Sequence, residues 1–194
     1  MSPRGRRPGG EDTRATILDA ARAEFAEQGY DATSLRAIAR RACVDPALVH
    51  HYFDGKSALF AEVMDLPIDP SLMIDRVLAG PREHVGAALV ETFLDVWDSP
   101  AGRQRFQAVV RSASSHDEAA RMLREFLTRE IFGRIAHALV PDGDDADLRA
   151  GLAAGQMLGM AMMRYVVDFP AVATARREEL VEVVGPVIQG YLAP

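Results

Sequence analysis

Apolar residues recur at helical spacing along nearly the whole chain, and this periodicity constrains the fold more than any other feature. In residues 12–29, Ile17 and Leu18 are followed at steps of three and four residues by Ala21 and Phe25. Few segments alternate apolar and polar residues, as a half-buried strand requires. The sequence therefore predicts an all-α fold.

Proline and glycine divide the periodic stretches into separate helices. Gly29 stands where a C′ glycine ends the first helix, and Asp12 or Thr13 can cap its start. Later breaks fall at Pro67, Pro70, Gly80-Pro81, Ser99-Pro100, the run 141–145 and Pro170. Between them the spacing predicts helices over 56–65, 71–79, 82–98, 101–114, 116–139, 145–168 and 176–192.

Composition narrows the class of protein. The chain has 194 residues and 48% hydrophobic content, enough to bury a core in one large or two small domains. No apolar run reaches the length of a membrane span, and no apolar segment follows the N-terminal arginines as in a signal peptide. The single cysteine, Cys43, excludes an internal disulfide. These features predict a cytoplasmic protein with no membrane partner.

Charge is distributed unevenly along the chain. The formal net charge is −6; residues 1–60 carry nine basic and eight acidic side chains, and residues 61–194 carry thirteen and twenty. Arg4, Arg6 and Arg7 lie among glycine and proline. Residues 1–11 are therefore predicted to form a disordered basic arm, with an ordinary solvated tail as the alternative.

Residues 33–53 predict two short helices joined by a tight turn. Thr33 is a candidate N-cap for the first, and Asp45 caps the second, with Pro46 at the first helical position, where proline costs nothing. The inner face of the first helix carries Leu35, Ile38, Ala39 and Ala42. A small residue, Ala39, at the crossing completes a helix-turn-helix.

The second of these helices contains adjacent histidines. His50 and His51 point about 100° apart, so they cannot chelate one ion as an i, i+4 pair can. Val49 and Phe53, four residues apart, are predicted to face the core. The residues left facing outward are Pro46, Ala47, Leu48, His50, His51 and Tyr52. In a recognition helix, such a side meets base edges and phosphates.

Four ordered motifs point to a known family: FAEQGYDATS at 25–34, IARRA at 38–42, VDPALVHHYF at 44–53 and KSALF at 56–60. With these motifs at this spacing, residues 12–60 resemble the DNA-binding domain of the TetR family of bacterial repressors. LGMAMMRYV and VGPVIQGYL, further along, look like the family's last two helices. The resemblance implies a three-helix helix-turn-helix DNA-binding domain at 12–60 and a larger C-terminal helical ligand-binding and dimerisation domain at 61–194.

The resemblance also implies which residues contact DNA. Lys56 matches the lysine that grips a phosphate at the start of the family's fourth helix, where a helix N-terminus also favours an anion. Arg36 matches a position that reaches a base in some members, with a solvated arginine as the alternative. The full implied set is Thr33, Ser34, Arg36, Arg40, Pro46, Ala47, Leu48, His50, His51, Tyr52 and Lys56.

Two positions depart from the family's pattern. Cys43 replaces the glycine often found in the turn, where a non-glycine residue at positive φ costs about 1 kcal/mol. As a redox-sensing thiol it would have no second cysteine to pair with. Leu48 stands where a small polar residue is common, which predicts contact with a thymine methyl group or partial burial. Both departures affect the operator sequence rather than the docking mode.

The last two helices predict a homodimer. Residues 176–192 carry apolar side chains around far more than one stripe, so one face packs on its own core and another requires a partner. Gly151, Gly155 and Gly159 would let a neighbouring helix approach closely, either within the chain or from a second copy. We expect a four-helix interface from residues 145–168 and 176–192 of each subunit. The dimer would bind a double-stranded, pseudo-palindromic operator.

The family further implies an effector cavity among the central helices. The candidate lining residues are large or adaptable side chains, each of which could equally be ordinary core: Phe93, Trp97, Phe106, Met122, Phe126, Met157, Met160 and Tyr165. Polar groups that could orient a ligand are Arg111, His116, His137, Gln156 and Arg164. The expected effector is a small hydrophobic or aromatic molecule.

Two other functions compete with a ligand-responsive repressor. An enzyme would need a catalytic motif, and G-x-S-x-G, H-E-x-x-H, C-x-x-C and the P-loop are all absent; the polar run 116–118 is more simply a helix cap. A constitutive or protein-regulated DNA-binding regulator without a small effector shares every N-terminal feature. The sequence predicts the ligand-responsive repressor, with no metal or cofactor.

Overall fold

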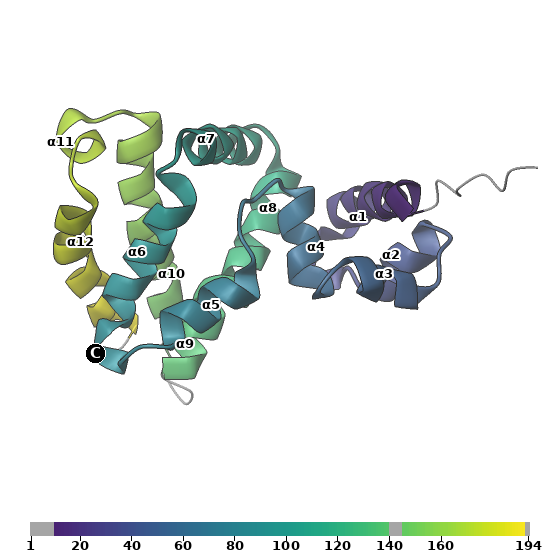
Figure 1. Ribbon diagram of the computed structural model, residues 1–194, viewed down its shortest axis with the longest axis horizontal. Coiled ribbons are helices and arrows are strands. Elements are labelled where there is room, and N and C mark those ends of the chain that lie inside the picture. Colours follow the sequence, from purple (N-terminus) through teal and green to yellow (C-terminus); the bar gives the residue numbers. More distant parts are fainter. Residues whose placement is uncertain (1–9, 140–144, 193–194) are drawn as a thin grey trace, which may run out of the picture.

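The computed structural model describes residues 10–139 and 145–192, and in those ranges the chain is almost entirely helical, with no strand. The prediction of an all-α fold is confirmed. Four helices form one end of the molecule (Figure 1): α1 (Gly10–Ala32), α2 (Leu35–Arg41), α3 (Pro46–Tyr52) and α4 (Gly55–Val63). No helix in the described part of the chain has the length and apolar character needed to cross a membrane.

The remaining helices form a larger body. In chain order they are α5 (Pro70–Leu78), the short η1 (Arg82–His84), α6 (Val85–Trp97), α7 (Pro100–Ser115), α8 (Asp117–Phe126), η2 (Leu127–Phe132), α9 (Gly133–Leu139), α10 (Ala146–Ala161), η3 (Met162–Val166), α11 (Pro170–Ala173) and α12 (Arg177–Leu192). The helices predicted from spacing agree with these bounds to within a few residues. The sequence pattern does not predict α11, because four residues are too few to show periodicity.

Two predictions concern residues at the edges of the described ranges. The predicted basic arm falls mainly on residues 1–9, which lie outside those ranges, while Gly10 and Glu11 already belong to α1. Most of the predicted break at 141–145 lies outside them as well.

Two long helices change their hydrogen-bonding pattern internally. η2 and η3 are π-helices, continuous with α8–α9 and with α10 respectively. A Cβ atom on Gly133 would lie 2.0 Å from the carbonyl oxygen of Thr128, so glycine is needed where the widened turn closes. Such turns are often found at functional sites.

The caps of α2 and α3 set the helix-turn-helix. Ser34 caps α2 by accepting a hydrogen bond from the Ala37 amide at 3.1 Å. The predicted cap, Thr33, is wrong: its side chain is 4% exposed and its hydroxyl donates to the Gly29 carbonyl at 2.7 Å. Asp45 caps α3 as predicted.

An aromatic cluster joins the N-terminal helices to the body. The Tyr30 ring lies 4.9 Å from that of Phe60 and 5.6 Å from that of Phe126 on α8, both edge to face. All three side chains are fully buried. Gly29, with φ of 84°, turns the chain beside this cluster, and a Cβ atom there would lie 2.9 Å from a guanidinium nitrogen of Arg121. Glycine is required here for its backbone conformation, because other residues rarely adopt this positive φ.

A buried ion pair secures the far end of the body. Arg164, in η3, is 5% exposed and binds Asp98 with two hydrogen bonds of 2.8 and 3.0 Å. Its third nitrogen donates to the carbonyls of Val172 and Ala175, so one guanidinium holds α6, η3 and the segment after α11 together. Burial opposes ionisation of Asp98, but the Arg164 hydrogen bonds outweigh burial and the pKa of Asp98 lies below its usual range.

Candidate functional site

The outer face of α3 is the first candidate site. Val49 and Phe53 are buried, as their spacing predicts. Tyr52 is half-buried, and its ring lies 5.1 Å from that of His51. The exposed residues of α3 are Pro46, Ala47, Leu48, His50 and His51. α3 therefore presents a continuous outward surface of imidazole, aromatic and small apolar groups.

Arginines of α2 extend this surface. Arg36 and Arg40 are exposed and make no ion pair or hydrogen bond within the described residues. Arg41 differs, because Glu24 and Glu27 on α1 bind its guanidinium. Of these three α2 arginines, Arg36 and Arg40 are therefore the ones available to meet a phosphate or a base edge.

The N-terminus of α2 contributes one of its two predicted contacts to the surface. Ser34 is exposed, although its hydroxyl oxygen is also the helix cap. Thr33 faces the interior, and the structure does not bring it together with the other predicted contacts.

Lys56 lies at the start of α4 but is half-buried and fully engaged. Its ammonium group donates to the carbonyls of Tyr30 at 2.8 Å and Thr33 at 3.1 Å, with Asp31 at 3.5 Å. It also lies 4.2 Å from the centre of the Tyr30 ring. Burial lowers the pKa of the Lys56 ammonium. In this structure the lysine holds the end of α1, and sequence reasoning did not anticipate that role.

The two departures from the family's pattern both face outward. Cys43 is exposed and adopts φ of 54°, which confirms the expected positive φ in the turn. Leu48 is 39% exposed, so it is partly buried, as one of the two expectations has it, and still partly accessible at the surface. Both side chains are accessible at the α3 surface.

A second candidate site is an apolar cavity of about 230 Å³ inside the body. Helices α5, α6, α7, α8, η2 and α10 all contribute side chains to its wall. The lining residues are Leu66, Ile68, Met73, Leu89, Phe93, Val96, Trp97, Phe106, Val109, Val110, Leu123, Leu127, Ile131, Phe132, Ala154, Gly155, Met157 and Leu158. None is charged, and the indole N–H of Trp97 is the one polar side-chain group among them.

Four of the eight predicted lining residues, Phe93, Trp97, Phe106 and Met157, do border the cavity. The other four do not. Phe126 belongs to the aromatic cluster with Tyr30, and Met122 is buried on the same helix. Tyr165 donates to Asp98 at 3.1 Å, and Met160 is buried near it in sequence on α10.

The polar groups predicted to orient a ligand are all absent from the cavity wall. Arg164 is bound to Asp98, and His137 lies in a different cleft. Arg111, His116 and Gln156 are not among the lining residues either. The lining residues that the sequence pattern missed are mostly aliphatic, and nothing in their spacing distinguishes them from ordinary core.

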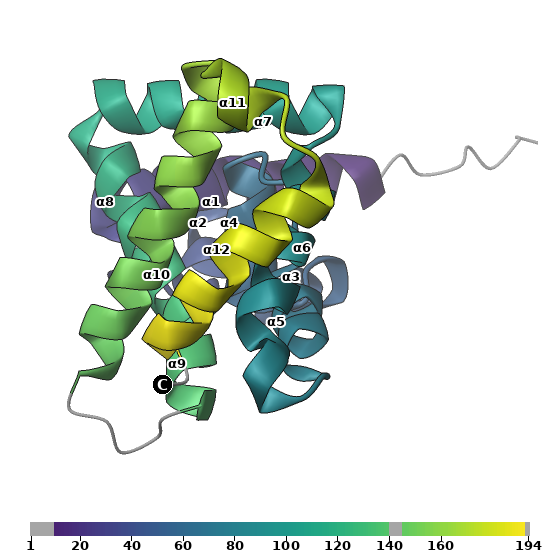
Figure 2. The ribbon, with the colours of Figure 1, turned by 90° about the vertical axis from the view of Figure 1, so that its left-hand side faces the viewer.

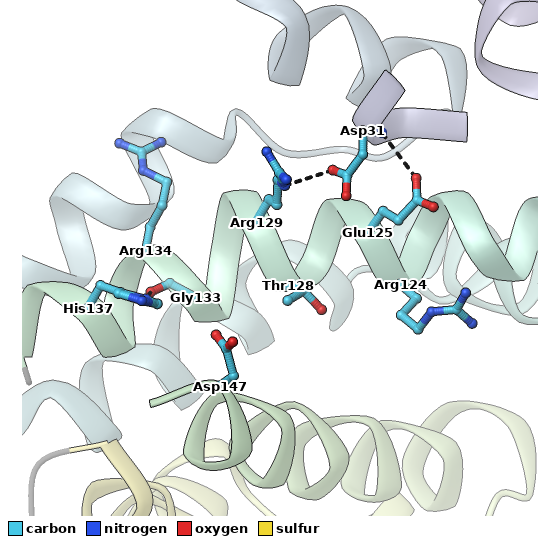
Figure 3. A pocket seen from close by; sticks show the side chains of 9 residues that line it. All are labelled: Asp31, Arg124, Glu125, Thr128, Arg129, Gly133, Arg134, His137 and Asp147. Atoms are coloured by element: carbon cyan, nitrogen blue, oxygen red, sulfur yellow. Dashed lines mark hydrogen bonds and ion pairs between the residues drawn. The ribbon is translucent and has the colours of Figure 1, made fainter. Parts of the chain in front are cut away.

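A polar cleft of about 580 Å³ lies between the α8–α9 rod and the start of α10 (Figure 3). Arg129 turns to Asp31, at 2.8 Å, and Nδ1 of His137 lies 2.8 Å from the Gly133 carbonyl oxygen. Arg124 and Arg134 point in different directions along the rod (Figure 3). The charged residues that line the cleft are mixed in sign and do not converge on one point. The cleft is therefore a weaker candidate for a ligand site than the apolar cavity.

The third candidate surface lies on α10 and α12, at the end of the molecule opposite to α3 (Figures 1 and 2). Apolar side chains that elsewhere would be buried are exposed here: Leu148, Leu152, Leu158, Met163, Val166, Val183 and Val187. A Cβ atom on Gly151, Gly155 or Gly159 would meet nothing within 4 Å. These glycines therefore do not ease packing within the chain.

The other face of α12 packs inward. Leu180, Val184, Ile188 and Leu192 are buried, against α6 among other helices. A Cβ atom on Gly86 of α6 would lie 2.2 Å from the Gly185 carbonyl oxygen, so the two helices touch at glycines. The prediction that α12 has one face for its own core and another left over is confirmed.

Comparison with known proteins places these features in a family. The family described as bacterial regulatory proteins, tetR family, matches residues 17–63, and that of the tetracyclin repressor-like C-terminal domain matches residues 83–192. Over 163 residues the chain is 29% identical to the HTH-type transcriptional regulator BetI of Rhizobium meliloti, covering 81% of this chain and 80% of that protein.

Solved structures are similar to this chain as well. A TetR-family regulator from Streptomyces coelicolor A3 is 37% identical, with 97% of this chain and 98% of that one covered and a TM-score of 0.46. NalD, the secondary repressor of the MexAB-OprM multidrug efflux pump in Pseudomonas aeruginosa, shares the fold at 20% identity and a TM-score of 0.52, covering 95% of this chain and 98% of that one. Because the two matched families cover most of its length, this chain belongs to the TetR family of DNA-binding transcriptional regulators.

Proposed function

We propose that the protein is a ligand-responsive repressor that leaves a pseudo-palindromic operator when a small apolar effector binds. Residues 12–60 form the DNA-binding part, and residues 61–194 bind the effector and dimerise. The apolar cavity of about 230 Å³ in the body is the observation that carries the response to a ligand.

DNA binding is assigned to the α3 surface and its flanks. α3 enters the major groove with its exposed residues toward base edges, as a recognition helix does. His50 and His51 supply hydrogen-bonding groups, and Leu48 supplies apolar contact with a thymine methyl group. Arg36 and Arg40 lie at the same surface and are unpaired within the described residues, and Ser34 lies at the N-terminus of α2. The sequence predicts that Lys56 contacts a phosphate, but its ammonium group already donates hydrogen bonds to the carbonyls of Tyr30 and Thr33.

Dimerisation is assigned to the exposed apolar face of α10 and α12. Leu148 is 65% exposed and Val183 is 70% exposed, which is costly for side chains of this size if they stay in water. The open space beside Gly151 and Gly159 would let a helix of a second copy approach closely. A two-fold interface of these helices would fix the distance between two α3 helices, as a palindromic operator requires.

The cavity defines the chemistry of the effector. Apolar cavities of about 150 Å³ accept benzene, so a volume of about 230 Å³ suits one ring with substituents, or a compact aliphatic molecule. Because no lining side chain could pair with an ion, a charged ligand would lose its hydration without compensation. The effector is therefore uncharged and mostly hydrocarbon.

A constitutive or protein-regulated DNA-binding regulator is the alternative function. It would share the α3 surface and the apolar face of α10 and α12. An apolar cavity lined by six helical segments is not needed for such a protein, and this observation favours the ligand-responsive repressor.

The response to a ligand can be tested with small hydrocarbons. An operator duplex is first selected from random DNA with the protein, and toluene, ethylbenzene and methylcyclohexane are then titrated into the complex. Because Trp97 borders the cavity and is the only tryptophan, its fluorescence should change over the same concentration range as DNA is released. Benzoate, which carries a charge on the same ring, is the control and should do neither. If no uncharged compound that changes Trp97 fluorescence releases DNA, the alternative function is correct.

A further inference from the structure

The α8–α9 rod borders both the apolar cavity and the N-terminal helices, and the π-helix η2 does both within one short segment. Leu127, Ile131 and Phe132 line the cavity. Between them, Glu130 accepts a hydrogen bond from the Tyr30 hydroxyl at 2.8 Å. The cavity wall and a side chain that holds α1 therefore lie within a single helical turn of each other.

Several polar contacts cross the same boundary, but they differ in strength. The ion pair between Arg129 and Asp31 joins side chains that are 62% and 40% exposed, so solvent screens it. Glu125 accepts from the Asp31 amide at 3.1 Å. The Tyr30 side chain is fully buried among aromatic rings, and its position is fixed by packing as well as by the hydrogen bond. The hydroxyl of Tyr30 is therefore the most rigid of these links.

Tyr30 is in turn connected to the helix-turn-helix. Its carbonyl accepts from the Lys56 ammonium, which also donates to the carbonyl of Thr33. Thr33 is followed directly by Ser34, the N-cap of α2. A chain of hydrogen bonds therefore runs from the cavity wall to the start of α2 through Glu130, Tyr30 and Lys56.

We propose that Glu130 is a positioning residue for DNA binding, and that η2 passes a change in the cavity to the helix-turn-helix through the hydrogen bond between Glu130 and Tyr30. Burial raises the pKa of the Tyr30 hydroxyl, so it remains a neutral donor. The π-helical turn is suited to this role because it carries the cavity-lining side chains and Glu130 on different sides of one short segment. The proposal rests on the cavity affecting DNA binding, as in the proposed function, but it can be tested without any ligand.

The test fills the cavity by substitution and measures operator affinity. Val110→Phe adds volume on α7, a helix that carries neither Tyr30 nor the proposed dimer face. By fluorescence anisotropy on the selected operator, Val110→Phe should weaken binding by about tenfold, in the range usual for coupled sites. In the Tyr30→Phe background, which keeps the ring and removes the hydroxyl, the same substitution should weaken binding by less than about threefold.

Further variants separate positioning from general damage. Glu130→Gln keeps an acceptor for the Tyr30 hydroxyl, so in this background Val110→Phe should still weaken operator binding by about tenfold. In the Glu130→Ala background, Val110→Phe should weaken binding by less than about threefold. Glu118→Ala, which removes an exposed glutamate from α8 on the same rod, is the matched control and should leave the coupling unchanged. Thermal melting identifies any variant that fails to fold, and Val109→Phe then replaces Val110→Phe as the cavity-filling substitution.

Two results would overturn the inference. One is an equal weakening by Val110→Phe with and without the Tyr30 hydroxyl, which would place the coupling elsewhere. The other is no weakening by either cavity-filling substitution in the wild-type background. Hydrocarbons could also release DNA while Val110→Phe weakens operator binding equally with and without the Tyr30 hydroxyl. That result would support the proposed function and reject the role of Glu130.

Discussion

The exposed faces at the two ends of the molecule are opposite in chemistry. The α3 face carries imidazoles and exposed arginines, and the α10–α12 face carries leucines, valines and open glycines. Association through the first should weaken steeply with salt, because phosphate contacts release counterions. Association through the second should not, because it removes apolar surface from water. Under the proposed assignments, one small all-α chain binds DNA and a second copy of itself through separate surfaces that rely on different physical forces.

The largest effect on dimerisation and operator binding is expected from a charged substitution in the apolar face of α10 and α12. Leu152→Arg would bury an unpaired cation, at a cost on the order of 3–5 kcal/mol, and a two-fold interface would contain it twice. We expect a monomer by sedimentation velocity and operator binding weaker by at least about 100-fold. Leu72→Arg, on α5, changes an exposed leucine outside this face and is the matched control. A dimer of Leu152→Arg with unchanged affinity would place the interface elsewhere.

Removing the buried cation behind the apolar face should have the next largest effect. Arg164→Ala leaves the partly buried Asp98 carboxylate without its main partner and should lower the free energy of unfolding by about 3 kcal/mol. Arg176→Ala, which removes an exposed guanidinium paired with Glu179, should barely change the melting temperature.

This second prediction also has a pH dependence with a definite sign. Because the folded pKa of Asp98 is depressed, the ion pair contributes fully above the ordinary aspartate pKa of about 3.9 and is lost as pH falls through the lower folded value. The difference in stability between wild type and Arg164→Ala should therefore shrink in acid. A difference that is constant from neutral pH to about pH 2 would show that the charge on Asp98 is not involved.

On the α3 face, substitution of a base-reading residue should change specificity. His51→Ala should alter the relative affinity for half-site variants by about 1 kcal/mol or more at the affected base pair. Binding measured against a library of single-base operator variants would reveal the position. A uniform loss across all variants would instead indicate that His51 contacts the backbone.

The smallest and most specific effects concern the cations beside α3. Arg40→Ala should lower the slope of log affinity against log salt by about 0.9 for each phosphate that the arginine neutralises. Lys56→Ala should change the slope less and the melting temperature more, because its ammonium binds carbonyls at the end of α1. A full drop in slope for Lys56→Ala, with unchanged melting temperature, would restore the phosphate contact predicted from the sequence.

The two ends also differ in how far the sequence predicts them. In α3, caps and a four-residue spacing decide which side chains face inward, and Val49, Phe53 and Asp45 lie as predicted. The same local signals fix the helices of the body to within a few residues. The partners of Lys56 and Thr33 are carbonyls at the end of α1, which a linear pattern does not bring together, so the sequence does not predict these contacts.

The cavity could be predicted only in part. Aromatic and methionine side chains are obvious candidates, yet Phe126 and Tyr165 satisfy other contacts, and aliphatic residues such as Val110 and Ile131 complete the wall. Which apolar residues border a cavity depends on how six helical segments pack, and spacing along one helix does not contain that information. The one sequence signal of the π-helical turn at η2 is Gly133. The reason for glycine at this position is clear only from the structure, where a Cβ atom would clash with the carbonyl oxygen of Thr128.

One measurement tests most directly whether the two ends bind their partners through different physical forces. The sedimentation of the protein and the anisotropy of a labelled operator duplex would be recorded together from about 50 mM to 1 M salt, the range over which phosphate contacts are screened out. We predict that the dimer mass persists throughout, while operator affinity falls by about 1,000-fold or more between 50 and 200 mM for six or more phosphate contacts. A protein that becomes monomeric as the salt rises, in parallel with release of DNA, would contradict the assignment of an apolar dimer interface to α10 and α12.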